Sequence, residues 1–173
     1  MYAYEEGKYI DIDSICESIS GDSGIDLVCV TGGEPLMQTG TTILVSLLVK
    51  MGYTVLIETN GSVKLHCLPG KAIYVMDVKC PDSGMSHHMD WDNMSIIRPQ
   101  DEVKFVLSSR SDYEWARGVL EDYHLFGKVK LLFSCTKGRI EPGTVAKWIL
   151  EDRLKVRLQI QLHKYIFDEE RGV

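Results

Sequence analysis

Apolar residues recur along this chain in two rhythms, one typical of strands and one typical of helices. Short runs rich in aliphatic and β-branched residues predict six strands, at residues 27–31, 53–58, 72–78, 102–107, 129–133 and 156–162. Apolar residues spaced three or four apart predict helices, at residues 12–20 and 39–51, from Ser111 to about Tyr123, and from Pro142 onward. Because strands alternate with helices, the pattern predicts an α/β fold with a mainly parallel sheet.

Capping signals predict where the helices begin and end. Ser14-x-x-Glu17 and Ser111-x-x-Glu114 have the spacing of capping boxes, and Pro142 fits the first turn of a helix. Gly52 suits the position that follows a helix. In the helix at residues 39–51 we expect five side chains to face the core: Ile43, Leu44, Leu47, Leu48 and Met51.

The strand at residues 27–31 is predicted to be buried, and it ends abruptly at Gly32-Gly33. Neither glycine has a Cβ, so main-chain groups there could contact a ligand directly, and Glu34-Pro35 would add a carboxylate on a stiffened backbone. An ordinary strand-to-helix turn, with Glu34 as a solvated carboxylate, would have the same composition.

Other polar residues also fall where predicted strands end: Glu58 to Gly61, Asp77 to Lys79, and His163. The carboxyl ends of parallel strands share one edge of a sheet, which is where α/β proteins place functional groups. Asn60-Gly61 could instead be a simple turn, Asp77 and Lys79 a surface ion pair, and His163 a core residue.

Length and composition narrow the class of protein. The 173 residues, 45% hydrophobic and 25% charged, suit one globular domain. A net charge of −6 argues against direct nucleic-acid binding and favours a small-molecule partner. No apolar run approaches the roughly 20 residues that cross a bilayer, and no leader pattern is visible, so we expect a cytoplasmic protein.

The five cysteines are scattered, and no two have Cys-x2-Cys spacing. Cys16 and Cys29 are expected to be buried thiols. His87-His88 with Asp90 and Asp92 has metal-ligand chemistry without regular spacing, so we expect no metal there.

Five motifs in order resemble the radical S-adenosylmethionine (radical SAM) superfamily and, within it, the 7-carboxy-7-deazaguanine synthase family. They are Thr31-Gly32-Gly33-Glu34-Pro35-Leu36, Glu58-Thr59-Asn60-Gly61, Asp77-Val78-Lys79-Cys80-Pro81 with Ser83-Gly84-Met85, Asp101 to Val106, and Gln159 to Lys164. The resemblance implies a partial (β/α) barrel that here forms a single domain over residues 1–173, without the family's first strand and cluster loop.

The resemblance also implies roles for individual residues. SAM would be bound by Gly32, Gly33, Glu34, Glu58, Asn60, Asp77, Val78 and Lys79, and the substrate by Thr31, Gln161 and His163. Asp77 and Val78 replace a frequent Ser-Pro of the family, so Lys79 carries over best. The substrate would be a tetrahydropterin, converted to a precursor of the modified nucleosides queuosine and archaeosine.

The family's Cys-x3-Cys-x2-Cys loop, with the threonine that binds Mg2+ beside it, does not occur in the sequence. Met1-Tyr2-Ala3 resembles the x-Tyr-Ala that follows Cys-Asp-Thr in the family, so the resemblance places the ligands of the cluster and of Mg2+ upstream of Met1. A tyrosine-rich N-terminus that simply packs on the surface is the alternative for these first residues.

SAM, a [4Fe–4S] cluster and Mg2+ are the family's cofactors. Because the ligands of the cluster and of Mg2+ do not occur in the sequence, we expect both to be absent from this chain. We therefore expect the chain by itself to be inactive, with no catalytic residue of its own. An activating enzyme of another radical SAM subgroup, or a cluster-free SAM- or pterin-binding or assembly protein, are the alternatives. A sheet without its first strand has an exposed edge, which favours pairing with another subunit, and so a homodimer, or else a rearranged terminus.

Overall fold

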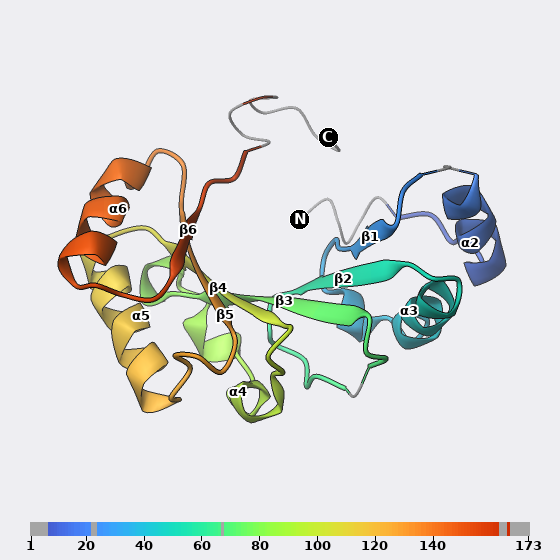
Figure 1. Ribbon diagram of the computed structural model, residues 1–173, viewed down its shortest axis with the longest axis horizontal. Helices are drawn as coiled ribbons and strands as arrows, with labels where there is room; N and C mark the ends of the chain where they lie inside the picture. The colour runs from blue at the N-terminus through green and yellow to red at the C-terminus, as the bar shows by residue number, and fades with distance from the viewer. Residues whose placement is uncertain (1–6, 22–23, 67, 163–165, 167–173) are drawn as a thin grey trace. The chain divides into compact units, whose positions relative to one another are not determined.

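The computed structural model describes residues 7–21, 24–66, 68–162 and 166 (Figure 1). One six-stranded sheet follows the chain order, with β1 and β6 at its two ends. Its strands are β1 (Leu27–Val30), β2 (Thr54–Thr59), β3 (Ala72–Lys79), β4 (Glu102–Leu107), β5 (Lys130–Cys135) and β6 (Arg157–Gln159). The sheet is parallel and does not close, which confirms the predicted α/β fold and partial barrel.

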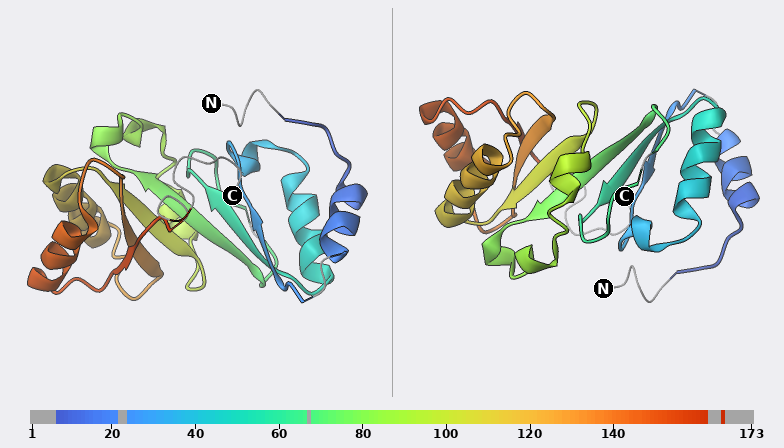
Figure 2. Two further views of the ribbon diagram at one scale, coloured as in Figure 1. Left: turned by 90° about the horizontal axis from the view of Figure 1, so that it is seen from above. Right: turned by 90° about the horizontal axis from the view of Figure 1, so that it is seen from below.

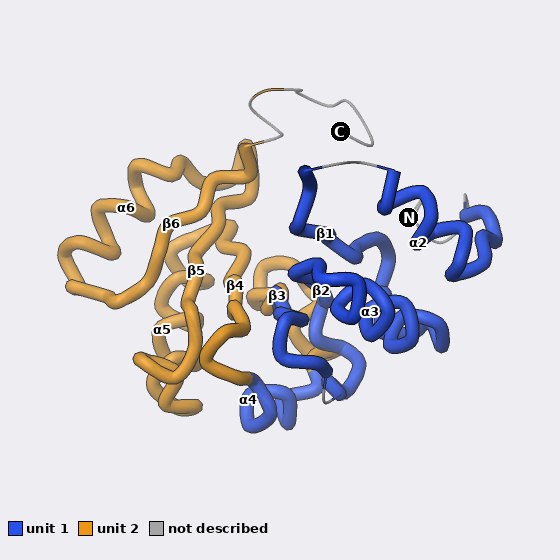
Figure 3. Tube along the Cα trace, turned by 45° about the vertical axis from the view of Figure 1, so that its right-hand side comes forward, with its two compact units in different colours: residues 1–76, 90–97 blue, residues 77–89, 98–173 orange. Residues whose placement is uncertain are grey.

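The chain divides into two compact units, and β3 passes from the first into the second (Figure 3). The first unit comprises residues 1–76 and 90–97, and the second comprises residues 77–89 and 98–173.

In the first unit, β1 pairs with β2 from Leu27 opposite Thr54, and β2 pairs with β3 from Val55 opposite Ala72. Its helices are α2 (Ile12–Ser20), the 3-10 turn η1 (Pro35–Met37), α3 (Thr41–Lys50) and α4 (Asn93–Ile96). Helix α3 packs on β2, and α2 lies beside α3 (Figure 2). Buried Val45 and Leu48 of α3, with Val55 and Ile57 of β2, form the core of this layer.

The second unit pairs β4 with β5 from Glu102 opposite Lys130, and β5 with β6 from Leu132 opposite Arg157. Its helices are the 3-10 turns η2 (Pro81–Ser83) and η3 (Ser86–His88), then α5 (Arg110–Asp122) and α6 (Pro142–Glu151). The ring of Phe133 packs edge-on against Tyr113 of α5, with centroids 5.6 Å apart. Because side chains alternate along a strand, Lys104, Leu132 and Ser134 point to the opposite face, which we call the polar face.

Strand β1 is not buried as predicted. Leu27 is 51% exposed, and Cys29, expected to be a buried thiol, is exposed, whereas Cys16 is half-buried. The reason is position, since β1 ends the sheet and helix α3 packs on β2. An apolar run alone does not distinguish an edge strand from a central one.

The expected inward face of α3 was also partly wrong. Leu48 is buried, but Ile43 and Met51 are exposed and the buried face runs through Thr41 and Val45. Apolar residues cover so much of this helix that their spacing does not single out one face. Gly52 does follow the helix with a positive φ of 105°.

The helix caps lie upstream of the predicted capping boxes. The carboxylate of Asp11 accepts from the Ser14 N–H at 2.9 Å and begins α2. The hydroxyl of Ser109 accepts from the Asp112 N–H at 3.1 Å and begins α5. Pro142 occupies the first turn of α6 as predicted. None of the helices described is long and apolar enough to span a bilayer.

Candidate functional site

The turn after β1 has a backbone that glycine alone adopts readily. Gly32 and Gly33 have φ angles of 97° and 55°, both in the positive region that L-residues avoid. Both residues are exposed, and a Cβ added to Gly32 would meet nothing within 4 Å. The turn therefore presents bare main chain to open space, as the glycine pair predicted.

The buried carboxylate of Glu34 holds this turn in place through hydrogen bonds. Its carboxylate, 3% exposed, accepts hydrogen bonds from the Leu36 N–H at 3.0 Å and from the Asn60 N–H at 2.8 Å. The Thr59 hydroxyl adds a contact at 2.9 Å to one oxygen and 3.0 Å to the other. Glu34 thus ties the end of β1 to the end of β2, and its hydrogen-bonding capacity is largely used within the protein.

Thr31 and Glu58 form the exposed side of the same turn. The Thr31 hydroxyl lies 3.3 Å from a carboxylate oxygen of Glu58, and both residues are exposed. Glu58 precedes buried Thr59 on β2 and points to the opposite face of the sheet. Of the two carboxylates at this turn, Glu58 is the one open to a ligand.

Asn60 begins a loop that is held in place from within the unit. Its side-chain oxygen accepts from the Ser62 N–H at 2.9 Å, which makes a local Asx turn. Asn93, which is fully buried, donates to the carbonyls of Gly61 and Val63 at 3.1 Å each and accepts from the Leu65 N–H at 2.9 Å. The Asn-Gly pair is therefore a turn, and it also supplies the N–H that Glu34 binds.

In the second unit, β3 ends in a cluster of charges. Nζ of Lys104 lies 2.7 Å from one oxygen of Asp77, and Nζ of Lys79 lies 3.4 Å from the other. The Lys104 contact pairs the charges without an aligned hydrogen bond. Val78, between Asp77 and Lys79, is fully buried, main chain included, so it presents no surface to a ligand. Sequence reasoning missed Lys104, whose role depends on its pairing with a residue of another strand.

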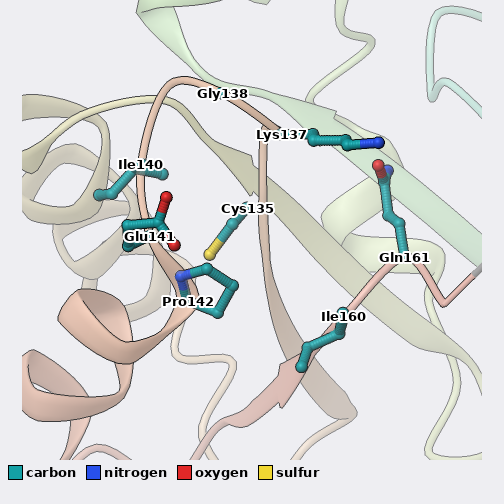
Figure 4. Close-up of a pocket in the computed structure, with 8 residues that line it drawn as sticks. All are labelled: Cys135, Lys137, Gly138, Ile140, Glu141, Pro142, Ile160 and Gln161. Atoms are coloured by element: carbon teal, nitrogen blue, oxygen red, sulfur yellow. The ribbon is translucent and has the colours of Figure 1, made fainter. Parts of the chain in front are cut away.

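A cavity of about 200 Å³ lies near the carboxyl end of β5 (Figure 4). It is lined by Cys135, Lys137, Gly138, Ile140, Glu141, Pro142, Ile160 and Gln161. Figure 4 shows the side chains of Lys137 and Gln161 directed toward each other. The side-chain oxygen of Gln161 is buried and has no hydrogen-bond partner among the described residues. His163, predicted to act with Gln161, lies outside the described residues.

Similarity to characterised proteins decides the family. No family model matches the chain. The 7-carboxy-7-deazaguanine synthase of Chlorobaculum tepidum is 37% identical over 178 residues, which cover 99% of this chain and 80% of that protein. The chain belongs to the 7-carboxy-7-deazaguanine synthase family. The synthase of Koribacter versatilis is 36% identical over 187 residues, 99% of this chain and 83% of that protein.

A solved structure supports the fold of this family member. The crystal structure of QueE from Escherichia coli has a TM-score of 0.70 at 19% identity, over 88% of this chain. The match spans 64% of that protein's chain, and at this identity it shows a shared fold. Family membership confirms the resemblance to the radical SAM superfamily.

Among the described residues of this family member, the remaining thiols and histidines form no reactive cluster. Burial, reinforced by the charge of Asp112, raises the pKa of the Cys80 thiol well above its usual range. Burial, with a smaller effect of Glu141, raises the pKa of Cys135 to about 11. The rings of His87 and His88 lie 4.0 Å apart, and within the described residues no three His, Cys, Asp or Glu side chains are placed to hold a metal.

The N-terminal match to the family falls outside the part of the chain that the structure describes. Met1, upstream of which the resemblance placed the cluster and Mg2+ ligands, is not among the described residues, and neither are Tyr2 and Ala3. Where those ligands lie, and whether the tyrosine-rich N-terminus packs on the surface, therefore stay predictions from the sequence.

Proposed function

We propose that this chain carries the SAM- and pterin-binding surfaces of a 7-carboxy-7-deazaguanine synthase. The reaction would be the conversion of 6-carboxy-5,6,7,8-tetrahydropterin to 7-carboxy-7-deazaguanine, with loss of ammonia. The observation that carries the proposal is the turn at Gly32 and Gly33, with exposed Glu58 beside it, in a chain 37% identical to a named synthase.

The residues at this turn fit the methionine end of SAM. The exposed main chain of Gly32 and Gly33 can approach a ligand closely, and the Glu58 carboxylate can pair with its ammonium group. Glu34, which the resemblance assigned to SAM binding, instead holds the turn in shape through its buried hydrogen bonds. Bound SAM together with an iron–sulfur cluster would supply the radical that removes a hydrogen atom from the substrate.

The remaining residues assigned to SAM and substrate, apart from the buried Val78, keep their roles within this proposal. Asn60 would contribute through its loop, and Asp77 and Lys79 through their charges. Thr31 would face the substrate from beside Glu58, and Gln161 would contact it from the cavity near β5, with His163 following it in sequence.

We further propose that the [4Fe–4S] cluster and Mg2+ are not bound by these 173 residues, because the sequence contains neither Cys-x3-Cys-x2-Cys nor the family's Cys-Asp-Thr with its Mg2+-binding threonine. Anaerobic incubation with iron and sulfide should then give no cluster absorbance, and no product should form from the carboxylated tetrahydropterin. A reconstituted cluster or measurable turnover would refute this part of the proposal and leave SAM binding untouched.

The test of SAM binding is ligand-observed NMR titration of the isolated chain. We expect saturable binding that weakens about tenfold in Glu58→Gln, since one charge-assisted contact is lost. Glu121→Gln, which changes an exposed carboxylate of α5, is the matched control and should bind like the wild type. If the wild type does not bind SAM, or if both variants bind equally well, the assignment of this turn fails.

Location and assembly complete the proposal. We infer a cytoplasmic enzyme, because Cys16, Cys80 and Cys135 are free thiols, as a reducing compartment favours. We infer a homodimer, because β1 ends the sheet among the described residues and exposes Leu27. Sedimentation velocity should give a mass of twice the 19.6 kDa chain, whereas a monomer would contradict the inference.

A further inference from the structure

The cavity near the carboxyl end of β5 belongs wholly to the second unit and combines apolar with polar walls (Figure 4). Polar side chains reach it from three segments: Lys137 follows β5, Glu141 precedes α6, and Gln161 follows β6. At about 200 Å³ it is smaller than the roughly 300–1,000 Å³ of sites that hold whole ligands, so it suits one ring of a larger molecule. Its apolar surface comes from Ile140, Pro142 and Ile160.

Gln161 presents to this cavity an acceptor that the described part of the protein leaves unused. Its side-chain oxygen is buried and has no hydrogen-bond partner among the described residues. A buried carbonyl oxygen without a donor raises the free energy of the protein, and a ligand that brings an N–H removes that cost. The orphaned oxygen therefore predicts a ligand with a hydrogen-bond donor at this wall.

Glu141 is a second acceptor in the same cavity. It occupies the N-cap position of α6, yet its side chain makes no capping hydrogen bond. Within the described ranges its carboxylate has no hydrogen-bond or ion-pair partner. Its charge acts at the cavity, because it adds to burial, the larger cause, in raising the pKa of Cys135 on the same wall. Since an ionised carboxylate only accepts, a matching ligand should present two N–H donors to this pair of acceptors.

The pyrimidine ring of a pterin has this pattern on one edge. Its N3–H and 2-amino groups are neighbouring donors, and the 4-oxo group beside them is an acceptor. The ammonium of Lys137, which Figure 4 shows directed toward Gln161, has three N–H groups with which to meet such an acceptor. Adenine presents an amino group beside a bare ring nitrogen, so its edge would leave one of the two acceptors unmatched.

We propose that this cavity holds the pyrimidine half of the pterin substrate. Gln161 accepts from N3–H, Glu141 accepts from the 2-amino group, and Lys137 donates to the 4-oxo group. The inference rests on the proposed function, and it gives Glu141 and Lys137 roles that none of the five sequence motifs assigns to them. Ring contraction alters the other ring of the substrate, so the product keeps the same edge and should bind in the same cavity.

The experiment compares two fluorescent probes, pterin and lumazine, which differ only at position 2, where pterin has an amino group and lumazine an oxo group. Fluorescence titration in mildly acidic buffer keeps N3–H on both probes. The wild-type chain should bind pterin about tenfold more tightly, because lumazine turns an acceptor toward the Glu141 carboxylate. Glu141→Gln should bind the two probes about equally, because an amide can accept from the amino group or donate to the oxo group.

Two further variants test the groups that the probes share. Gln161→Met and Lys137→Met should each weaken the binding of both probes several-fold and keep the preference for pterin, since N3–H and the 4-oxo group occur in both. The matched control is Glu151→Gln, which removes an exposed carboxylate at the other end of α6 and should behave like the wild type. Because Glu141 is exposed and caps nothing, Glu141→Gln should keep the melting temperature of the wild type.

The outcomes distinguish this inference from the proposed function. If the wild type binds pterin but binds lumazine equally well, or if Glu141→Gln keeps the preference, the pyrimidine site is refuted and the proposed function stands. The same conclusion follows if 7-deazaguanine, which has the edge of the product, does not displace pterin from the wild type. If the wild type binds neither probe, the proposed function fails and the inference fails with it.

Discussion

Replacing Glu34 by alanine tests whether this carboxylate holds the candidate site together. The change removes the acceptor of two main-chain N–H groups, those of Leu36 and Asn60, and of the Thr59 hydroxyl. Each buried donor left unsatisfied costs about 1–3 kcal/mol, and water entering the vacated space recovers part of that cost. We expect Glu34→Ala to lower the free energy of unfolding by about 3 kcal/mol.

Urea denaturation measures the free energy, and amide hydrogen exchange locates the effect. In the wild type the Asn60 N–H is held at 2.8 Å and should exchange slowly, and in Glu34→Ala it should exchange at close to the rate of an open loop. Glu58→Ala, at the exposed carboxylate of the same turn, is the matched control and should change stability by less than about 0.5 kcal/mol. Equal losses of stability in the two variants would show that Glu34 does not hold the turn in place. So would an Asn60 N–H whose exchange rate is unchanged by Glu34→Ala.

Three further changes test other parts of the structure. Gly32→Ala forces an L-residue to a φ of 97° and should lower the free energy of unfolding by about 1–2 kcal/mol. Gly118→Ala, inside helix α5, should instead raise it by about 0.5–1 kcal/mol. Melting temperatures that shift in the same direction in both variants would contradict the assigned backbone. Iodoacetamide should alkylate exposed Cys29 in the native protein at pH 8. Alkylation of Cys135, whose pKa is about 11, should accelerate about tenfold per pH unit between pH 8 and 10, because its thiolate fraction rises with pH. Equal alkylation rates of the two cysteines by peptide mass spectrometry would refute the assigned environments. Asp112→Asn should lower the free energy of unfolding by about 1–3 kcal/mol. The Asp112 carboxylate accepts from the main-chain N–H groups of Asp82 at 3.0 Å and Ser108 at 2.9 Å, and an amide cannot accept equally from both. Unchanged urea denaturation would contradict this role.

Much of the fold was predictable from local pattern because local physics determines it. Helix α2 and strand β4 have the predicted bounds, and Pro142 begins α6, since apolar spacing and proline geometry act over a few residues. The caps at Asp11 and Ser109 were missed because several nearby residues could each cap a helix, and the fold selects one.

The environment of each residue depends on contacts that the local sequence does not contain. Cys29 lies in an apolar stretch typical of a core strand. It is exposed because its strand, β1, forms an edge of the sheet. Asn93 lies in a stretch without periodicity, yet it is fully buried and anchors a loop some thirty residues earlier in the chain. No signal in its neighbourhood indicates that role.

The polar residues of the candidate site divide by whether their hydrogen bonds are satisfied within the protein. Glu34 and Glu58 belong to neighbouring motifs, but the first is buried with three donors and the second is exposed beside Thr31. A satisfied carboxylate stabilises the turn and gains little from a ligand, whereas an exposed one has capacity for a cation. The same distinction holds at the end of β3, where Lys104 is paired closely with Asp77 and Lys79 is the more exposed of the two lysines. Family motifs identify the residues that form the site. The hydrogen bonds of each residue then distinguish those that hold the site in shape from those that can bind a ligand.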